Sequence, residues 1–325
     1  MEAVRLGRSG LRVTPVSLGC MAFGRWIDEA ASRRVFDAAV DAGVMLFDTA
    51  DIYGRGMETG NPLQGGESED ILGRIMGEKR NRIVLATKGA GRTGLGPNDS
   101  GLSRYHLIRA VEASLKRLKT DTIDLYQVHR FDEHTPLDET MQALDDLVAS
   151  GKIQYIGCSN FAAWQLAKAN ALADARGWRP FVSVQPLYNM LSRDIERELL
   201  PYALADGIGV IAYSPLARGV LTGKHRPNAA DPASERNAAG DRALRRLLAE
   251  ERSFRVADGA RRIAEAKGWK PAKLAMRWLL DRPGVTTALV GASKPEHVYN
   301  AVEAAGAEPL TEAEHEAIEN VCRNE

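Results

Sequence analysis

Residues 123–156, IDLYQVHRFDEHTPLDETMQALDDLVASGKIQYI, contain two short apolar runs separated by an amphipathic stretch. The runs at 123–128 and 153–156 are rich in Ile, Leu and Val, as strands covered on both faces are. The stretch at 137–149 has the length of an ordinary helix, and Ser150-Gly151 directly after it is a helix stop signal. These residues therefore predict a strand–helix–strand unit with parallel strands.

The same alternation recurs along most of the chain and defines the fold class. Eight such units in 325 residues predict an α/β fold, a (β/α)₈ TIM barrel. Residues 1–325 are expected to form a single domain. Strands are predicted at residues 16–18, 45–47, 83–86, 123–128, 153–156, 181–184, 210–213 and 288–290. Helices are predicted at residues 30–42, 67–76, 103–118, 137–149, 162–175, 195–205, 255–267 and 295–305.

Additions to the barrel are visible as well. Residues 4–13 predict an N-terminal β-hairpin, and residues 271–280 and 311–321 predict extra C-terminal helices. Long loops are expected at 54–66, 89–102 and 217–252, and loops of that length are usually functional. No GxGxxG follows a strand and opens a helix, because Gly89-Ala90-Gly91 continues to Gly94 with another spacing. A dinucleotide would therefore be bound without the Rossmann turn.

Composition excludes several classes of partner. The chain has 43 basic and 43 acidic residues, so we expect neither a nucleic acid nor a membrane partner. Three widely spaced cysteines, Cys20, Cys158 and Cys322, show no metal-binding pattern, which predicts a reducing compartment and no metal. The first residues lack the apolar core of a signal peptide, and no apolar run has the length of a membrane span. The expected location is cytoplasmic.

Ionisable residues follow three of the predicted strands. Asp48 comes after 45–47, Lys88 after 83–87 and His129 after 123–128, while Tyr53 lies five residues past Asp48. Each alone has an ordinary structural explanation, as a turn former, a solvated charge, a hydrogen-bonded ring or a packing residue. In a barrel, however, the carboxyl ends of the strands meet at one mouth, where active sites lie. We therefore predict that these four side chains form one site.

The four residue types suit acid catalysis at a carbonyl group. A tyrosine has a pKa of about 10, which is high for an acid that works near neutrality. A neighbouring Lys88 ammonium is expected to lower the pKa of Tyr53, while Asp48 holds Lys88 charged and oriented. His129 would orient a carbonyl oxygen or relay a proton. The set would polarise C=O and protonate it as a hydride arrives.

At this point the chain resembles the aldo-keto reductase superfamily, within it the bacterial branch that is similar to channel β subunits. Residues 47–54, FDTADIYG, look like that family's active-site signature. Residues 86–88, ATK, and 124–129, DLYQVH, also match, and the likeness runs from Leu18-Gly19 to residues 291–294. The resemblance implies that Tyr53 is the general acid, tuned by Lys88 and Asp48, with His129 orienting the substrate.

The resemblance also implies an NADPH/NADP⁺ cofactor, with NAD less favoured, laid across the barrel mouth. Ser159, Asn160 and Gln185 would hold the carboxamide, and Tyr213 would stack on the nicotinamide ring. His297 stands where the best-studied branch has Arg, so the preference for NADP rests mainly on Lys294 and Lys224. The remaining matching positions would contact the phosphates and the adenosine: Ser214, Pro215, Leu216, Arg218, Gly219, Gly291, Ser293 and Asn300.

The sequence gives little indication of which substrate is preferred. Trp26 and Phe131 are candidates for an aromatic pocket wall, with core packing as the alternative. The expected reaction is reduction of an aldehyde or ketone to an alcohol, or the reverse oxidation of a secondary alcohol. Two alternatives stay open: an NADP(H)-binding regulatory subunit with little turnover, and a barrel isomerase or aldolase that uses Lys88 as a Schiff base.

Overall fold

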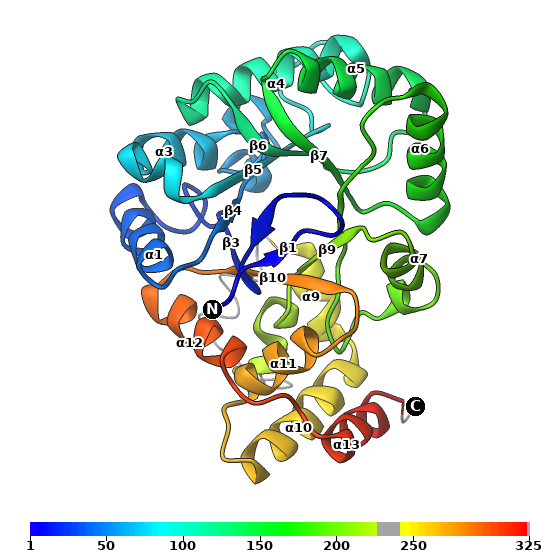
Figure 1. Cartoon of the computed structure of the whole chain (residues 1–325). Coiled ribbons are helices and arrows are strands. Elements are labelled where there is room, and N and C mark those ends of the chain that lie inside the picture. Colours follow the sequence, from blue (N-terminus) through cyan, green and yellow to red (C-terminus); the bar gives the residue numbers. More distant parts are fainter. Residues whose placement is uncertain (226–240, 324–325) are drawn as a thin grey trace.

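The computed structural model describes residues 1–225 and 241–323, and its centre is a closed barrel of parallel strands. Neighbours around the ring follow the order β10-β3-β4-β5-β6-β7-β8-β9, so the predicted (β/α)₈ TIM barrel is confirmed. Figure 1 shows helices surrounding this barrel on its outside. The strands are β3 (Val16–Gly19), β4 (Leu46–Asp48), β5 (Val84–Gly89), β6 (Ile123–Val128), β7 (Ile153–Ser159), β8 (Ser183–Gln185), β9 (Gly209–Tyr213) and β10 (Val285–Gly291).

The helices that follow the strands form the outer layer, and their ends show why they begin where they do. Asp28 accepts a hydrogen bond from the backbone N–H of Ala31 at 2.8 Å, and Ser103 accepts one from that of His106. Pro271 and Pro295 each occupy a first helical position, where the missing N–H costs nothing. The helices are α1 (Glu29–Asp41), α3 (Glu67–Ile75), α4 (Arg104–Leu118), α5 (Leu137–Ala149), α6 (Ala163–Arg176), α7 (Leu199–Ala205), α11 (Pro271–Leu280) and α12 (Pro295–Ala305).

The N-terminal hairpin, β1 (Val4–Arg5) and β2 (Arg12–Val13), closes the lower end of the barrel and lies in front of it in Figure 1. Leu6 and Val13 join the apolar side chains that fill the barrel interior. The backbone here passes so near the chain before β9 that a Cβ on Gly7 would lie 2.3 Å from the carbonyl oxygen of Gly207. Gly7 also has φ +59, a conformation that only glycine adopts at little cost.

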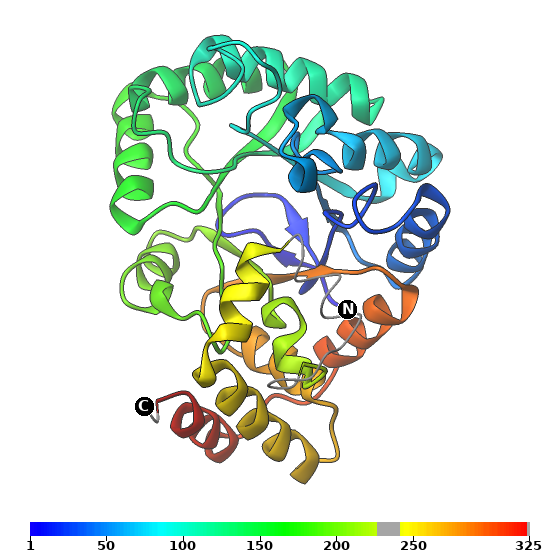
Figure 2. The same ribbon diagram turned by 180° about the vertical axis from the view of Figure 1, so that it is seen from behind.

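Three further helices lie beyond the regular alternation. They are α9 (Arg242–Ala249), α10 (Glu251–Ala266) and α13 (Glu312–Arg323). In Figure 2, which views the molecule from the side opposite the hairpin, α9 and α10 lie beside the segment that follows β9. The predicted extra C-terminal helices at 271–280 and 311–321 are confirmed as α11 and α13.

Three expectations of local structure are wrong. Residues 195–205 are not one helix but a 3₁₀ turn, Asp194–Glu196, followed by α7. Tyr188 and Arg193 hydrogen-bond the Glu196 carboxylate, and these contacts hold the turn apart from the helix. The expected loop 217–252 contains a 3₁₀ segment, Ala217–Thr222, as well as α9 and the start of α10, while its residues 226–240 lie outside the described part. The loop 54–66 contains α2 (Gly56–Thr59) and a 3₁₀ turn, Pro62–Gln64.

The missed helix α9 has an identifiable cause. The arginines at 242–246 were interpreted as a solvated helix face, but the Pro, Asn, Asp and charged residues of 217–252 led to the whole segment being predicted as a loop. Asp241 caps the helix by accepting hydrogen bonds from the backbone N–H groups of Ala243 and Leu244. Leu244 is buried, with Leu247 and Leu248 packed beside it against the main core. This one-sided tertiary packing outweighs the charged composition.

Candidate active site

Alternation along the strands places four polar side chains just above the apolar filling of the barrel. Leu46, Ala86 and Leu125 belong to the interior apolar cluster, and successive inward positions on a strand are two residues apart. The next inward positions are therefore Asp48, Lys88 and Gln127, which are buried together with Gln185 at the end of β8.

These side chains form one hydrogen-bonded network centred on Asp48. The Lys88 ammonium pairs with one oxygen of the Asp48 carboxylate, which anchors the charge. The other carboxylate oxygen accepts from the amide groups of Gln127 at 2.8 Å and Gln185 at 3.0 Å. Lys88 also donates to the backbone carbonyl of Thr49 at 2.9 Å. A buried ion pair is tolerable because its remaining lone pairs and protons are satisfied in this way.

Tyr53 and His129 complete the group. The Lys88 ammonium donates to the Tyr53 hydroxyl at 3.3 Å and lies 4.9 Å from the centre of that ring. The rings of Tyr53 and His129 meet edge to face with centroids 5.7 Å apart. The backbone of His129 is held by Gly89, whose carbonyl accepts its N–H at 2.8 Å. The structure thus brings Asp48, Tyr53, Lys88 and His129 together at one end of the barrel.

The charge states differ from expectation at one residue. Loss of water raises the pKa of Tyr53, and this outweighs the lowering by Lys88. The expectation that Lys88 brings the pKa of Tyr53 below its usual value is therefore wrong for the protein without bound ligand. Burial alone would lower the pKa of Lys88, but Asp48 and Tyr53 raise it, so Lys88 stays charged. A charged lysine is a poor Schiff-base nucleophile, which counts against the aldolase alternative.

His129 is neutral near neutrality. Burial and the neighbouring charges of Lys88 and Arg130 lower its pKa to about 3. The Nδ1 atom is buried and has no hydrogen-bond partner among the described residues. The imidazole can therefore orient a substrate oxygen as a neutral group, without adding positive charge to the site.

Behind the strands lies a second buried polar layer that sequence reasoning missed. The Glu69 carboxylate accepts a hydrogen bond from the Thr87 hydroxyl at 2.5 Å and one from the Arg117 guanidinium at 2.7 Å. The charges of Glu69 and Arg117 therefore form an ion pair. Asp51 is buried beside them, and neither of its carboxylate oxygens has a partner among the described residues. Burial and repulsion from Glu69 raise the pKa of Asp51 to about 8, so this carboxyl group is protonated at neutral pH.

Asn160, Ser159 and Gln185, which were predicted to hold the carboxamide of the cofactor, lie close to the four residues Asp48, Tyr53, Lys88 and His129, called the tetrad below. The Asn160 side chain donates to the His129 carbonyl at 3.0 Å and accepts from the Tyr213 hydroxyl at 2.9 Å. Ser159 donates to the backbone carbonyl of Gln185 at 2.8 Å. The amide nitrogen of Gln185 is bonded to Asp48 and Gln127, so this residue belongs to the tetrad's support as much as to a cofactor site. Gln127 is an inward polar residue within an apolar strand, a signal that the sequence offered.

The loop after β9 has the strained backbone found at ligand sites. Ser214, Ala217 and Arg218 have φ values of 57°, 45° and 57°, and non-glycine residues rarely adopt such values. Arg218 pairs with Asp241, the cap of α9. A Cβ built on Gly219 would lie 2.9 Å from the Lys224 ammonium, which therefore rests against the loop. Pro215 is buried and Leu216 half-buried within the same turn.

A basic edge faces this loop at the start of α12. Burial is the main cause that lowers the pKa of His297, and the nearby charges of Lys224 and Lys294 lower it further. Side chains from two distant segments therefore converge at this point. The backbone N–H of Ser293 donates to Nδ1 of His297 at 3.3 Å. Gly291 and Asn300 are exposed nearby. Such a cluster at a helix N-terminus suits a phosphate group.

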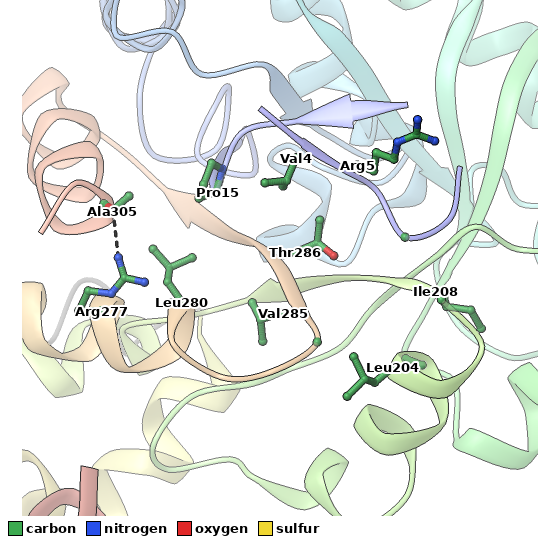
Figure 3. Close-up of a pocket in the computed structure, with 14 residues that line it drawn as sticks. Val4, Arg5, Pro15, Leu204, Ile208, Arg277, Leu280, Val285, Thr286 and Ala305 are labelled. Carbon is green, nitrogen blue, oxygen red and sulfur yellow. Dashed lines mark hydrogen bonds between the residues drawn. The ribbon is translucent and has the colours of Figure 1, made fainter. Parts of the chain in front are cut away.

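The two substrate-wall candidates have different surroundings. Trp26 is 43% exposed, and its indole N–H donates to Glu58 at 3.0 Å. Phe131 is half-buried and packs edge to face on Phe161, with ring centroids 5.4 Å apart. A separate pocket of about 440 Å³ lies at the hairpin end of the barrel, lined by Val4, Leu204 and Leu280 among others (Figure 3). It is remote from the tetrad.

The described residues were searched for groups of metal ligands and for helices that could cross a membrane. Within residues 1–225 and 241–323, no three His, Cys, Asp or Glu side chains are grouped as a metal site would need. The helices of the same residues fall short of the length and apolar character that a membrane crossing requires. All three cysteines lie within these ranges and are buried free thiols.

At this end of the barrel a buried lysine–aspartate pair lies beside a tyrosine hydroxyl and a histidine ring, which are groups that can donate or accept a proton. The model of the aldo/keto reductase family matches residues 15–323, and the chain belongs to that family. It is 40% identical over 311 residues to the uncharacterized oxidoreductase YrpG of Bacillus subtilis, covering 94% of this chain and 91% of that protein. Family membership supports oxidoreductase activity on carbonyl compounds, and the family generally uses NAD(P)H.

Two other relatives carry more specific names. The chain is 36% identical over 329 residues to versiconal hemiacetal acetate reductase of Aspergillus parasiticus, covering 93% of this chain and 92% of that protein. It is 35% identical over 317 residues to a probable voltage-gated potassium channel subunit beta of Oryza sativa, covering 95% and 93%. The matched family therefore includes proteins named as reductases and proteins named as channel subunits.

Proposed function

We propose that this protein is an NADP(H)-dependent reductase of aldehydes and ketones that also oxidises the corresponding alcohols. The observation that carries the proposal is the position of the Lys88 ammonium, which bonds both the Asp48 carboxylate and the Tyr53 hydroxyl. Few structural needs explain a buried lysine, since burying a charge is costly unless it is fully paired. Stabilising a phenolate explains it directly.

The chemistry of the site follows from the charge states. Tyr53 keeps its proton, because its pKa is raised, until a carbonyl oxygen takes it. Lys88 then stabilises the phenolate that remains, and Asp48 keeps Lys88 charged. Neutral His129 orients the carbonyl oxygen toward Tyr53. In the direction of alcohol oxidation, the phenolate accepts the hydroxyl proton.

The residues at the mouth fit a nicotinamide dinucleotide with an extra phosphate. When bound, this cofactor supplies the hydride that the carbonyl carbon accepts. Asn160 and Ser159 would hold the carboxamide and Tyr213 would stack on the ring, while the strained loop 214–219 would wrap the pyrophosphate. Lys224, Lys294 and His297 would bind the 2′-phosphate, and this convergence supports NADP over NAD.

The experiment is to purify the protein and follow NADPH and NADH oxidation over aldehydes, ketones, quinones and sugars. The reverse reaction is followed with NADP⁺ and alcohols. Turnover that prefers NADPH is expected. Absence of turnover in both directions with every substrate would contradict the proposal.

A second candidate function is that of a cofactor-binding regulatory subunit. The likeness to proteins named as potassium channel β subunits favours it. Tight NADPH binding with negligible turnover in the same experiment is the outcome that would select this function over the first.

A further inference from the structure

The first turn of α3 lies against the segments that carry the tetrad. Ser68 is the second residue of this helix, and its side chain is fully buried. The first N–H groups of a helix have no partner within the helix itself. The N–H of Ser68 donates to the backbone carbonyl of Tyr53 at 3.1 Å. This end of the helix is therefore satisfied by the backbone of a tetrad residue.

The hydroxyl group of Ser68 makes two hydrogen bonds, both to residues beside Asp48. It donates to the backbone carbonyl of Cys20 at 2.8 Å. It accepts from the hydroxyl of Thr49 at 2.8 Å, and Thr49 is itself fully buried. Cys20 in turn donates its N–H to the Asp48 carbonyl at 2.8 Å. One serine hydroxyl therefore joins the segment after β3 to the segment after β4.

The bond between Ser68 and Thr49 leads directly to Lys88. The Thr49 carbonyl accepts from the Lys88 ammonium at 2.9 Å, and the same ammonium donates to the Tyr53 hydroxyl at 3.3 Å. The N–H of Thr49 donates to the Ala86 carbonyl on β5 at 2.9 Å. Ser68 holds the remaining polar group of Thr49, its side-chain hydroxyl, so this residue is fixed at all of its polar groups.

Another layer of the same barrel contains a buried hydroxyl pair that serves as a comparison. Ser17 on β3 and Thr287 on β10 are both fully buried, and their hydroxyl oxygens lie 2.6 Å apart. Ser17 lies two residues before Gly19, which is in register with Asp48, so the pair lies one layer below the tetrad. Such a pair satisfies its own buried polar atoms. The bonds of Ser68 differ because they continue into the tetrad.

We infer that Ser68 is a positioning residue for Lys88. Its hydroxyl fixes Thr49, whose carbonyl in turn holds the Lys88 ammonium beside Tyr53. The inference rests on the proposed reductase function and adds to it a residue that acts through Lys88. Without the hydroxyl, Thr49 loses one of its attachments and Lys88 is held less firmly beside the phenolate. The pKa of Tyr53 then rises, because a nearby ammonium favours the charged form of the phenol.

The test is the pH dependence of kcat for the oxidation of benzyl alcohol by NADP⁺, which requires the Tyr53 phenolate. For Ser68→Ala, the apparent pKa below which kcat falls should rise by about half a unit, which leaves about threefold less phenolate at a given lower pH. Thr49→Val removes the same hydrogen bond and should give the same shift, and the double variant should shift no further. Thr49→Ser keeps the hydroxyl and should keep the wild-type profile.

Ser17→Ala is the matched control, because it also removes a buried hydroxyl that is bonded to another hydroxyl. Urea unfolding should show a loss of stability in this variant, while its pH profile should remain that of the wild type. An unshifted profile in Ser68→Ala, or an equal shift in Ser17→Ala, would overturn the inference. The titratable groups around Tyr53 are the same in all of these variants: Lys88, Asp48, Asp51, His129 and Tyr213.

If the wild type turns over neither alcohols nor carbonyl compounds, the proposed function fails. The positioning role is then tested without turnover by ultraviolet titration of tyrosinate, after subtraction of the same titration of Tyr53→Phe. A higher midpoint in Ser68→Ala than in the wild type would support the role, and equal midpoints would end it. Thr49→Val takes the place of Ser68→Ala in both measurements if the latter does not fold.

Discussion

The ammonium of Lys88 lies 3.3 Å from the hydroxyl of Tyr53 and donates a hydrogen bond to it. Both groups lie at the end of the barrel opposite the hairpin, and Lys88 is held from behind by Asp48. In the proposed mechanism, this relationship places a permanent cation beside the phenolate that Tyr53 becomes when it donates its proton. The first two predictions follow from it.

Replacement of Tyr53 by Phe should lower turnover by at least about 100-fold, since general acid catalysis contributes that much. Cofactor affinity should change little, because the Tyr53 hydroxyl bonds Lys88 and not the cofactor candidates. Steady-state NADPH oxidation and a fluorescence titration with NADPH would measure the two effects. Retention of most of the turnover would refute the role assigned to Tyr53.

Replacement of Lys88 by Met should destabilise the fold as well as abolish turnover. Asp48 would be left as a buried carboxylate without its cation, a change that costs about 3–5 kcal/mol. Urea unfolding followed by circular dichroism would measure the loss. The double variant Lys88→Met/Asp48→Asn should regain part of the stability without regaining activity. Equal stability of the single variant and the wild type would contradict the pairing.

Replacement of Asp51 by Asn should change how stability depends on pH. The pKa of Asp51 is raised to about 8 from 3.8, so the folded state keeps a proton that the unfolded chain releases. The stability from this proton is fully present below pH 4 and is lost as the pH rises through about 8. Relative to the wild type, Asp51→Asn should gain more than about 1 kcal/mol between pH 5 and pH 8, because one pKa unit equals about 1.4 kcal/mol. Urea titrations at both pH values would test this, and parallel curves would exclude a protonated Asp51.

Replacement of Lys294 by Ala should weaken NADPH binding about tenfold or more and leave NADH binding nearly unchanged. A charge-assisted hydrogen bond to a phosphate contributes about 1.5–3 kcal/mol, and NADH lacks the 2′-phosphate. Dissociation constants from fluorescence titration at low and high salt would show the effect. Lys273→Ala is the matched control, because its ammonium pairs with Glu303 on the outer helices. An equal loss for both cofactors would place the phosphate elsewhere.

The sequence alone was sufficient to predict the barrel, its strands, and the grouping of Asp48, Lys88 and His129 at the strand ends with Tyr53 in the loop after Asp48. Apolar periodicity and stop signals are local, so α5, α11 and α12 occupy their predicted residues. Asp48, Lys88 and His129 each follow an apolar run, and the parallel topology alone brings such ends together. The arginines of α9 were interpreted as a solvated helix face within a long loop, and the burial of its leucines was missed because it depends on packing against a distant core and not on local composition.

Only the tertiary structure decided the charge states and supporting contacts of the site. The amides of Gln127 and Gln185 reach Asp48 from positions 79 and 137 residues away, and local sequence does not say which carboxylate they contact. The raised pKa of Tyr53 and of Asp51 results from the exclusion of water, which depends on how the surrounding elements pack. The ring contacts of Phe131 with Phe161 and Trp164 likewise join the segment after β6 to the segment after β7. Residue types and strand order are local properties, whereas burial and long-range contacts exist only once the barrel has closed.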